Sequence, residues 1–173
     1  PDIKEIIEDG STLKDNAILK AKFVHRKTGL PAIADDTGLE VDALDGAPGV
    51  YSARFAGENC SYNDNVIKLL SKMKNIPEKQ RGARFTTIMV YIDDKVELIA
   101  KGTVKGVITT EPKGFGGFGY DPVFYVPELH KTFAEITMKE KSKISHRGKA
   151  VRGLFKLLSE NSVIPSTNRE EPA

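Results

Sequence analysis

Apolar side chains recur at helical spacing in three segments of the chain. The first predicted helix covers residues 12–28, with Thr12 as its N-cap, Asp15 as the capping-box partner and Gly29 as the residue that stops it. Its apolar face consists of Leu13, Ala17, Ala21 and Val24. The spacing therefore predicts one amphipathic helix near the start of the chain.

Two further helices are predicted by the same periodicity. One follows Ser61, which forms a capping pair with Asp64, and the other follows Ser145. The apolar positions are Val66, Leu69, Leu70 and Met73 in the first, and Val151, Leu154, Phe155 and Leu158 in the second. We expect both sets to face the core.

The segments between these helices are typical of strands and loops. Residues 82–93 are rich in β-branched and aromatic side chains, and after a turn a second such run covers residues 96–110, which predicts a β-hairpin. A glycine-dense loop at 113–119 leads into a short strand at 122–126, and residues 129–144 are mixed and lysine-rich. Because helices and strands alternate, we expect an α/β fold with a mixed central sheet flanked by helices.

Length and composition bound the class of protein. The 173 residues suit one domain, placed at 1–160, followed by a polar tail at 161–173. A net charge of +2 is too small to indicate binding to nucleic acid or to a membrane surface. The single cysteine, Cys60, is read as structural and fits a reducing compartment, so a cytoplasmic location is expected.

Two adjacent carboxylates, Asp35 and Asp36, follow the apolar run 30–34. Consecutive residues of a strand point to opposite faces, so these two are expected to do different work. Mg²⁺ prefers oxygen ligands, and Glu8 is a plausible second carboxylate for it. The alternative is that Asp35 and Asp36 only form a capped turn. Nearby Glu40 and Asp42 are interpreted as a solvated strand face.

Cations cluster where a helix does not favour them. His146, Arg147 and Lys149 lie in the first turn of the last helix, although the N-terminal end of a helix favours anions. An anion or an electron-rich ligand at this position would explain them, and Lys141 just upstream strengthens that interpretation. A solvent-exposed basic turn is the alternative.

The glycine-rich loop matches neither a P-loop nor a dinucleotide fingerprint. Its aromatic residues Phe115, Phe118 and Tyr120 could stack on a planar base, with Asp121 as a hydrogen-bonding anchor. The alternative is that these aromatic side chains belong to the core. The residues alone thus indicate a metal-assisted phosphate-handling site beside an aromatic pocket, and they do not identify the base.

Taken together, the motifs resemble the inosine triphosphate pyrophosphatase family, which acts on non-standard purine nucleoside triphosphates. Their order and spacing cover nearly the whole chain up to about residue 158. They are 8–12 (EDGST), 16–17 (NA), 20–21 (KA), 34–39 (ADDTGL), 46–54 (GAPGVYSAR), 117–124 (GFGYDPVF), 131–135 (KTFAE), and Lys141 with 145–150 (SHRGKA).

This resemblance implies Mg²⁺-dependent hydrolysis of ITP, dITP and XTP to the monophosphate and pyrophosphate, by a two-lobed α/β homodimer with a cleft between the lobes. It implies that Asp36 is the proton acceptor and a metal ligand, with Glu8 as the other metal ligand. The implied substrate-binding residues are Lys20 and Lys141 at the phosphates, Phe118, Gly119, Tyr120 and Asp121 around the base and sugar, His146 and Arg147 at the purine edge, and Asp35 and Thr37.

An arginine donor suits the 6-oxo group of hypoxanthine or xanthine and meets a donor amine in adenine. An unpaired buried donor costs about 1–3 kcal/mol, which is enough to discriminate against ATP. The exclusion of guanine does not follow from these residues.

The sequence departs from the family pattern at its start. The family begins with a strand and a Thr-x-Asn-x-x-Lys phosphate-binding turn that precede the first motif found here. We therefore expect the sequence to be incomplete at its N-terminus, and we interpret Ser166-Thr167-Asn168 as tail rather than as that turn. Two alternative functions remain open: a nucleotide-binding module without turnover, and a related hydrolase for modified pyrimidine triphosphates.

Overall fold

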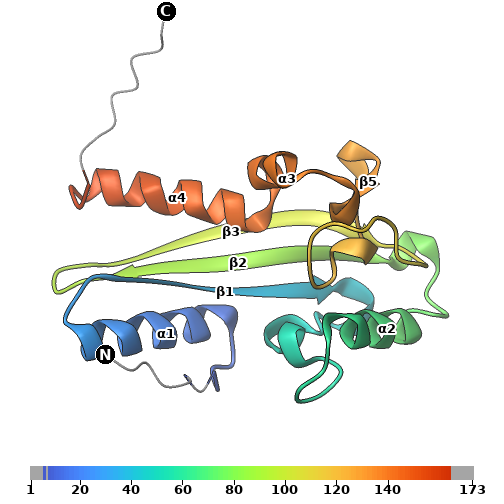
Figure 1. Cartoon of the computed structure of the whole chain (residues 1–173), viewed down its shortest axis with the longest axis horizontal. Coiled ribbons are helices and arrows are strands. Elements are labelled where there is room, and N and C mark those ends of the chain that lie inside the picture. Colours follow the sequence, from blue (N-terminus) through green and yellow to red (C-terminus); the bar gives the residue numbers. More distant parts are fainter. Residues whose placement is uncertain (1–5, 7, 165–173) are drawn as a thin grey trace, which may run out of the picture.

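Three long strands run along the molecule, with helices on both sides of them (Figure 1). The structure is a computed structural model and describes residue 6 and residues 8–164. The strands are β1 (Ala32–Val41), β2 (Gly82–Ile92), β3 (Glu97–Ile108), β4 (Phe124–Val126) and β5 (Lys131–Thr132). The α-helices are α1 (Leu13–Thr28), α2 (Tyr62–Lys72), α3 (Met138–Ile144) and α4 (His146–Glu160).

The sheet has the order β1-β2-β3-β4-β5. Every strand pair among the described residues is antiparallel, so the expected mixture of parallel and antiparallel pairs is wrong, while the α/β class is confirmed. Two of the connections, β2–β3 and β4–β5, are short. The β2–β3 turn, for example, is closed by Asp93, whose Oδ1 accepts hydrogen bonds from the backbone N–H groups of Lys95 and Val96, each at 2.8 Å.

Helix α1 covers one face of the sheet. As predicted, Thr12 caps it, accepting a hydrogen bond from the backbone of Asp15 at 3.1 Å, and Gly29 ends it with a left-handed φ of 67°. Ala17 and Ala21 are fully buried against apolar residues of β2. Their small side chains let the helix lie close to the strands, which brings its polar neighbours within reach of β1.

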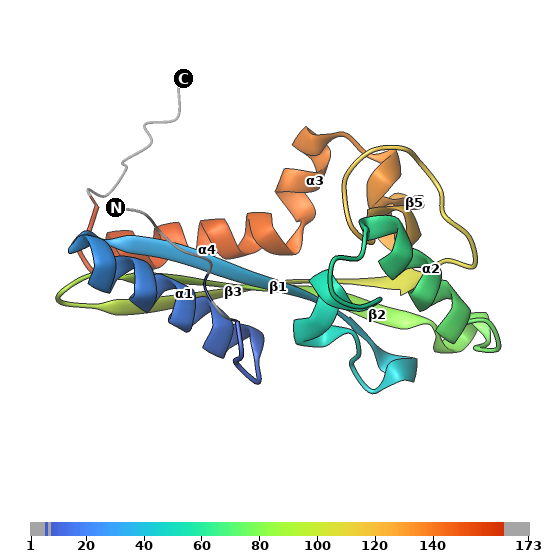
Figure 2. The ribbon, with the colours of Figure 1, turned by 60° about the horizontal axis from the view of Figure 1, so that its bottom comes forward.

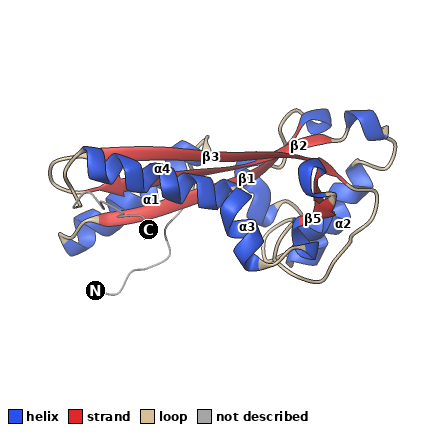
Figure 3. Ribbon diagram, turned by 90° about the horizontal axis from the view of Figure 1, so that it is seen from above, coloured by secondary structure: helices blue, strands red, loops and turns tan. Residues whose placement is uncertain are grey.

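Helix α4 covers the opposite face of the same strands, lying along them when the molecule is seen from above (Figure 3). Ser145 caps it by accepting a hydrogen bond from the Gly148 N–H at 3.1 Å, as predicted. The expected apolar face is only half right, because Val151 and Phe155 are 40% and 55% exposed. The buried row is Ala150, Leu154 and Leu158. A small residue at position 150 permits the closest approach to the sheet, and this rotates the bulkier neighbours outward.

A third apolar cluster fills the other end of the molecule. It joins α2 to the ends of the long strands and to the segments around β4 and β5; its largest fully buried members include Leu39, Leu69, Phe124 and Phe133. The molecule therefore has two lobes that share one sheet, the first built around α1 and α4 and the second around α2 (Figure 2).

The segment between the short strand and the last helix contains structure that the sequence pattern did not predict. Within residues 129–144 lie β5, a 3₁₀ turn and α3, which begins with a capping box between Thr137 and Glu140. The strand expected at 122–126 begins at Phe124, after a 3₁₀ turn. Residues 165–173, which include Ser166-Thr167-Asn168, lie outside the described residues. None of the described helices has the length and apolar character needed to cross a membrane.

Gly102 of β3 lies directly beneath α4, and a side chain there would overlap the carbonyl oxygen of His146. We expect Gly102→Ala to lower the free energy of unfolding by about 1–3 kcal/mol, because α4 must move away from the sheet. Urea denaturation measures this change. Gly153→Ala, within α4, is the matched control, because its added methyl would lie 3.5 Å from Ala100 of β3, an ordinary van der Waals contact. That variant should lose nothing or gain up to about 1 kcal/mol. Equal losses in both variants would contradict the close approach.

Candidate functional site

A cavity of about 310 Å³ lies where the two lobes meet. Every site residue that the family resemblance implied lines it: Glu8, Lys20, Asp35, Asp36, Thr37, Phe118, Gly119, Tyr120, Asp121, Lys141, His146 and Arg147. The fold thus brings together residues from α1, β1, the glycine-rich loop, α3 and α4. Their individual roles in binding and catalysis stay predictions.

The alternation of β1 separates the two adjacent carboxylates. Asp36 lies on the α1 face, where Lys20 donates to its Oδ1 at 2.8 Å. Asp35 lies on the α4 face, where Arg147 donates to its Oδ2. The expectation of opposite faces is confirmed, and neither carboxylate merely closes a turn.

Lys20 lies between two carboxylates at one end of the cavity. Its Nζ is 2.8 Å from Asp36 Oδ1 and 3.2 Å from Glu8 Oε1. Burial raises the pKa of Asp36 above its usual value, the hydrogen bond and charge of Lys20 oppose this, and the charge of Glu8 adds to it. A carboxylate whose pKa is raised is a better proton acceptor. Lys20 is therefore part of this cluster, whereas by itself its sequence position reads as a surface lysine.

The backbone that carries Glu8 is held from two sides. Asn16, which is 1% exposed, accepts a hydrogen bond from the Gly10 N–H at 2.8 Å, and its amide lies 3.4 Å from Asp36 Oδ2. Arg54 donates to the Glu8 carbonyl oxygen at 3.2 Å. The segment from Gly46 to Arg54, which had no derived role in the sequence, therefore positions one of the two acidic residues.

The donor chemistry at this end fits a hard divalent cation. Mg²⁺ is usually held by one or two carboxylates together with substrate phosphates and waters, and Glu8 and Asp36 face the same ammonium group. Within the described residues, no cluster of three or more His, Cys, Asp or Glu side chains could hold a metal by itself. Phosphate oxygens would have to complete the coordination.

Aromatic and charged groups meet at the other end of the cavity. Lys141 and Asp121 form a buried ion pair, with side chains 8% and 3% exposed. The Lys141 ammonium lies 4.7 Å from the ring centroid of Phe118, whose backbone N–H donates to Asp121 Oδ2 at 2.9 Å. Lys141 thus lies on the aromatic side, away from the acidic cluster, and the phosphate contact implied for it stays a prediction.

The three aromatic residues of the glycine-rich loop have different positions. Phe118 lines the cavity with 48% of its surface exposed, so part of its ring is accessible for stacking. Tyr120 is buried, and its hydroxyl donates to the Ser52 carbonyl oxygen at 3.0 Å, so it supports the loop. Phe115 is fully exposed and does not line the cavity, so its expected place in the pocket is wrong.

His146 is buried in the cavity wall as a neutral ring. It stacks on Phe85, with centroids 4.6 Å apart and planes at 20°. Burial, together with the charges of Arg147, Lys141 and Lys149, lowers its pKa to about 3. Its Nδ1 has no hydrogen-bond partner among the described residues. A buried ring nitrogen without a hydrogen-bond partner is energetically costly, so a ligand that supplies this partner would be favoured.

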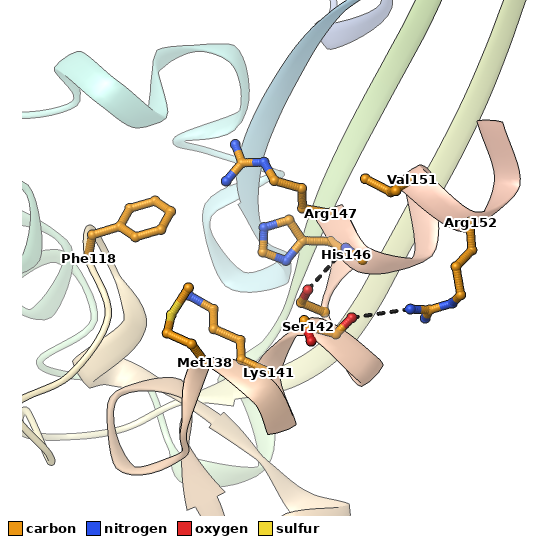
Figure 4. A pocket seen from close by; sticks show the side chains of 10 residues that line it. Phe118, Met138, Lys141, Ser142, His146, Arg147, Val151 and Arg152 are labelled. Carbon is orange, nitrogen blue, oxygen red and sulfur yellow. Dashed lines mark hydrogen bonds between the residues drawn. The ribbon is translucent and has the colours of Figure 1, made fainter. Parts of the chain in front are cut away.

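A second cavity of about 400 Å³ shares a wall with the first. Phe118, Lys141, His146 and Arg147 line both, so the two cavities adjoin at these side chains. In Figure 4, Phe118 lies across the cavity from His146 and Arg147, and Lys141 projects between them from α3. A planar group between Phe118 and the first turn of α4 would therefore meet both polar residues.

Sequence reasoning missed Ser52, Ala53, Tyr62 and Phe85 in the cavity lining. Phe85 lies within a continuous apolar strand and gives no signal that separates it from the core.

Glu40 was also misjudged as a solvated side chain. Arg84, its cross-strand partner, donates to both of its carboxylate oxygens at 3.0 and 3.2 Å. Asp42 is largely exposed, as expected.

Comparison with known proteins gives one consistent result. A sequence model of the Ham1 family matches residues 1–157. A dITP/XTP pyrophosphatase of Shigella flexneri is 54% identical over 154 residues, which cover 87% of this chain and 78% of the relative. The structure is similar to the Ham1 protein of Staphylococcus aureus, with a TM-score of 0.87 and 44% identity over 93% of this chain and 83% of that one. A HAM1 protein of Coxiella burnetii gives a TM-score of 0.85 and 44% identity, over 92% and 81% of the two chains.

The depressed pKa of His146 predicts a pH-dependent stability. An unfolded histidine takes up a proton below about pH 6.5, whereas folded His146 does so only near pH 3. The unfolded state thus binds more protons between these values, so the free energy of unfolding falls as the pH is lowered through this window. Between pH 6.5 and 4.5, the wild type should lose about 2 kcal/mol more than His146→Gln. Urea denaturation at both pH values tests this, and parallel pH profiles would contradict it.

Proposed function

The chain belongs to the Ham1 family, and from this premise we propose that it hydrolyses ITP, dITP and XTP to the corresponding monophosphate and pyrophosphate. One observation carries the proposal: the same cavity is lined by a carboxylate–lysine cluster and by the aromatic ring of Phe118 and the guanidinium of Arg147. The carboxylate–lysine cluster suits the phosphates of a nucleotide, and the aromatic pocket suits its base.

Asp36 is the group best placed to accept a proton. In the reaction, a water oxygen bonds to the α-phosphorus, the bond from that phosphorus to the bridging oxygen breaks, and pyrophosphate leaves. The proton released by the water goes to a base. The carboxylate of Asp36 lines the cavity, and its raised pKa strengthens it as an acceptor. Lys20 holds this carboxylate in place and supplies a positive charge beside the phosphates.

The residues also support a role for magnesium. Glu8 and Asp36 would hold Mg²⁺, which supplies charge neutralisation at the phosphates when bound. The protein's own contribution is to keep both carboxylates next to Lys20, through the contacts of Asn16 and Arg54 with the Glu8 segment.

The other end of the cavity suits a 6-oxopurine. Phe118 offers a ring face, and Arg147 offers N–H donors that match a 6-oxo oxygen and oppose a 6-amino group. His146 is neutral, so it adds hydrogen-bonding capacity without adding charge. Adenine would leave the arginine donor unpaired, at a cost of about 1–3 kcal/mol.

We expect the wild-type protein to release pyrophosphate from ITP, dITP and XTP in the presence of Mg²⁺, with much less from ATP. A panel of triphosphates with a pyrophosphate assay measures this. Nucleotide binding without product would favour a binding module, and preference for modified pyrimidine triphosphates would favour the related hydrolase. Either result would overturn the proposed activity.

Asp36→Asn should lower kcat for ITP by at least about 100-fold, because the substituted amide cannot accept the proton. Circular dichroism should show that the fold is retained, since the two side chains have the same shape. Asp42→Asn is the matched control, because Asp42 is exposed and lies outside the cavity. That variant should stay within twofold of the wild type. Near-normal turnover in Asp36→Asn would remove this residue from the role of base.

The family resemblance also suggests a cytoplasmic homodimer. Sedimentation velocity of the purified protein is expected to give twice the mass of 19.0 kDa calculated for this sequence. A single species at the monomer mass would contradict the dimer without bearing on the chemistry of the cavity.

A further inference from the structure

Asp35 makes its strongest contacts across the cavity, with a residue of another element. Its Oδ2 accepts from both Nε and Nη2 of Arg147, at 3.2 and 3.0 Å. Nη2 also lies 3.4 Å from the hydroxyl of Thr37 on the same strand. That hydroxyl is 2.7 Å from the hydroxyl of fully buried Thr87 on β2. One edge of the guanidinium is therefore held by two side chains of β1, one of which is hydrogen-bonded to the neighbouring strand β2.

The opposite edge of the guanidinium remains available. Among the described residues, Nη1 of Arg147 makes no hydrogen bond, and the guanidinium carbon lies 6.0 Å from the ring centroid of Phe118. Arg147 lines both adjoining cavities, and Figure 4 shows its side chain on the far side of the pocket from Phe118. A base stacked on Phe118 would thus meet a donor whose direction is already set.

An arginine at this place would otherwise be poorly fixed. Arg147 lies in the first turn of α4, where the helix dipole disfavours a cation, and its side chain is 44% exposed. A long, exposed side chain has many rotamers, and ordering it during binding costs affinity. A mobile guanidinium could also turn away from an amino group and so tolerate the wrong base. A fixed one both favours the 6-oxo group and rejects the 6-amino group.

We propose that Asp35 is a positioning residue for base selectivity: it holds Arg147 so that the free donor edge faces the 6-position of the purine. This inference rests on the proposed function. It assigns the two adjacent carboxylates of β1 to different parts of the reaction, with Asp36 serving the phosphate end and Asp35 the base end. It differs from a role of Asp35 as a support for Asp36, which would affect all substrates alike.

The test compares the binding of inosine and adenosine monophosphates to the full chain by isothermal titration calorimetry. In Asp35→Asn, the dissociation constant of inosine monophosphate should rise about tenfold, while that of adenosine monophosphate should not rise by more than twofold. The ratio of kcat/KM for ITP over ATP should fall by a similar factor. Asp42→Asn is the matched control and should keep both dissociation constants within twofold. Equal weakening of both nucleotides in Asp35→Asn would overturn the proposal.

A double-mutant cycle with Arg147→Lys separates this mechanism from a general structural effect. If Asp35 acts through Arg147, then Asp35→Asn should change the selectivity of the Arg147→Lys protein by less than twofold. Additive losses would overturn the proposal.

Asp35→Glu keeps the charge and should retain more selectivity than Asp35→Asn. The same loss of selectivity in both variants would also overturn the proposal. A wild-type protein without selectivity for inosine nucleotides would instead defeat the proposed function itself.

Discussion

The period-two alternation of β1 is the constraint from which the site is built. Because neighbouring side chains of a strand point to opposite faces, the pair Asp35 and Asp36 delivers one carboxylate to each side of the sheet. Each meets a cation from the helix on its own face, Lys20 of α1 and Arg147 of α4. A shift of one residue in the pairing of β1 with β2 would exchange these partners and dismantle both ends of the cavity.

Close packing of the helices makes these contacts possible. Fully buried alanines of α1 lie against β2, and Gly102 of β3 leaves room for the backbone of α4. Larger side chains at these points would push the helices away from the sheet and lengthen these hydrogen bonds. The apolar core thus contributes stability, and it also sets the distances between residues that are far apart in the sequence.

Charge in the cavity is balanced locally. Glu8 and Asp36 share Lys20, Asp121 pairs with Lys141, and Asp35 pairs with Arg147. Such pairing is required where charged groups leave bulk water. His146 has no carboxylate partner and is kept neutral instead, since burial and three neighbouring cations oppose its protonation. A phosphate-bearing ligand would enter a space whose cations are already ordered.

The sequence by itself determined the elements with strong local signals and most of the residues of the site. The caps at Thr12, Ser61 and Ser145 and the hairpin around Asp93 depend on hydrogen bonds within a few residues, so they were readable from the chain. The motifs also identified most of the residues that line the cavity. Tertiary structure decided what the local pattern leaves open. It made the described strand pairs antiparallel, turned Val151 and Phe155 outward, moved Phe115 out of the pocket and paired Glu40 with Arg84. It also showed that Asp35 holds Arg147, a contact between residues 112 positions apart. Such outcomes depend on how helices rotate against a sheet and which distant groups then meet, and neither periodicity nor spacing encodes that.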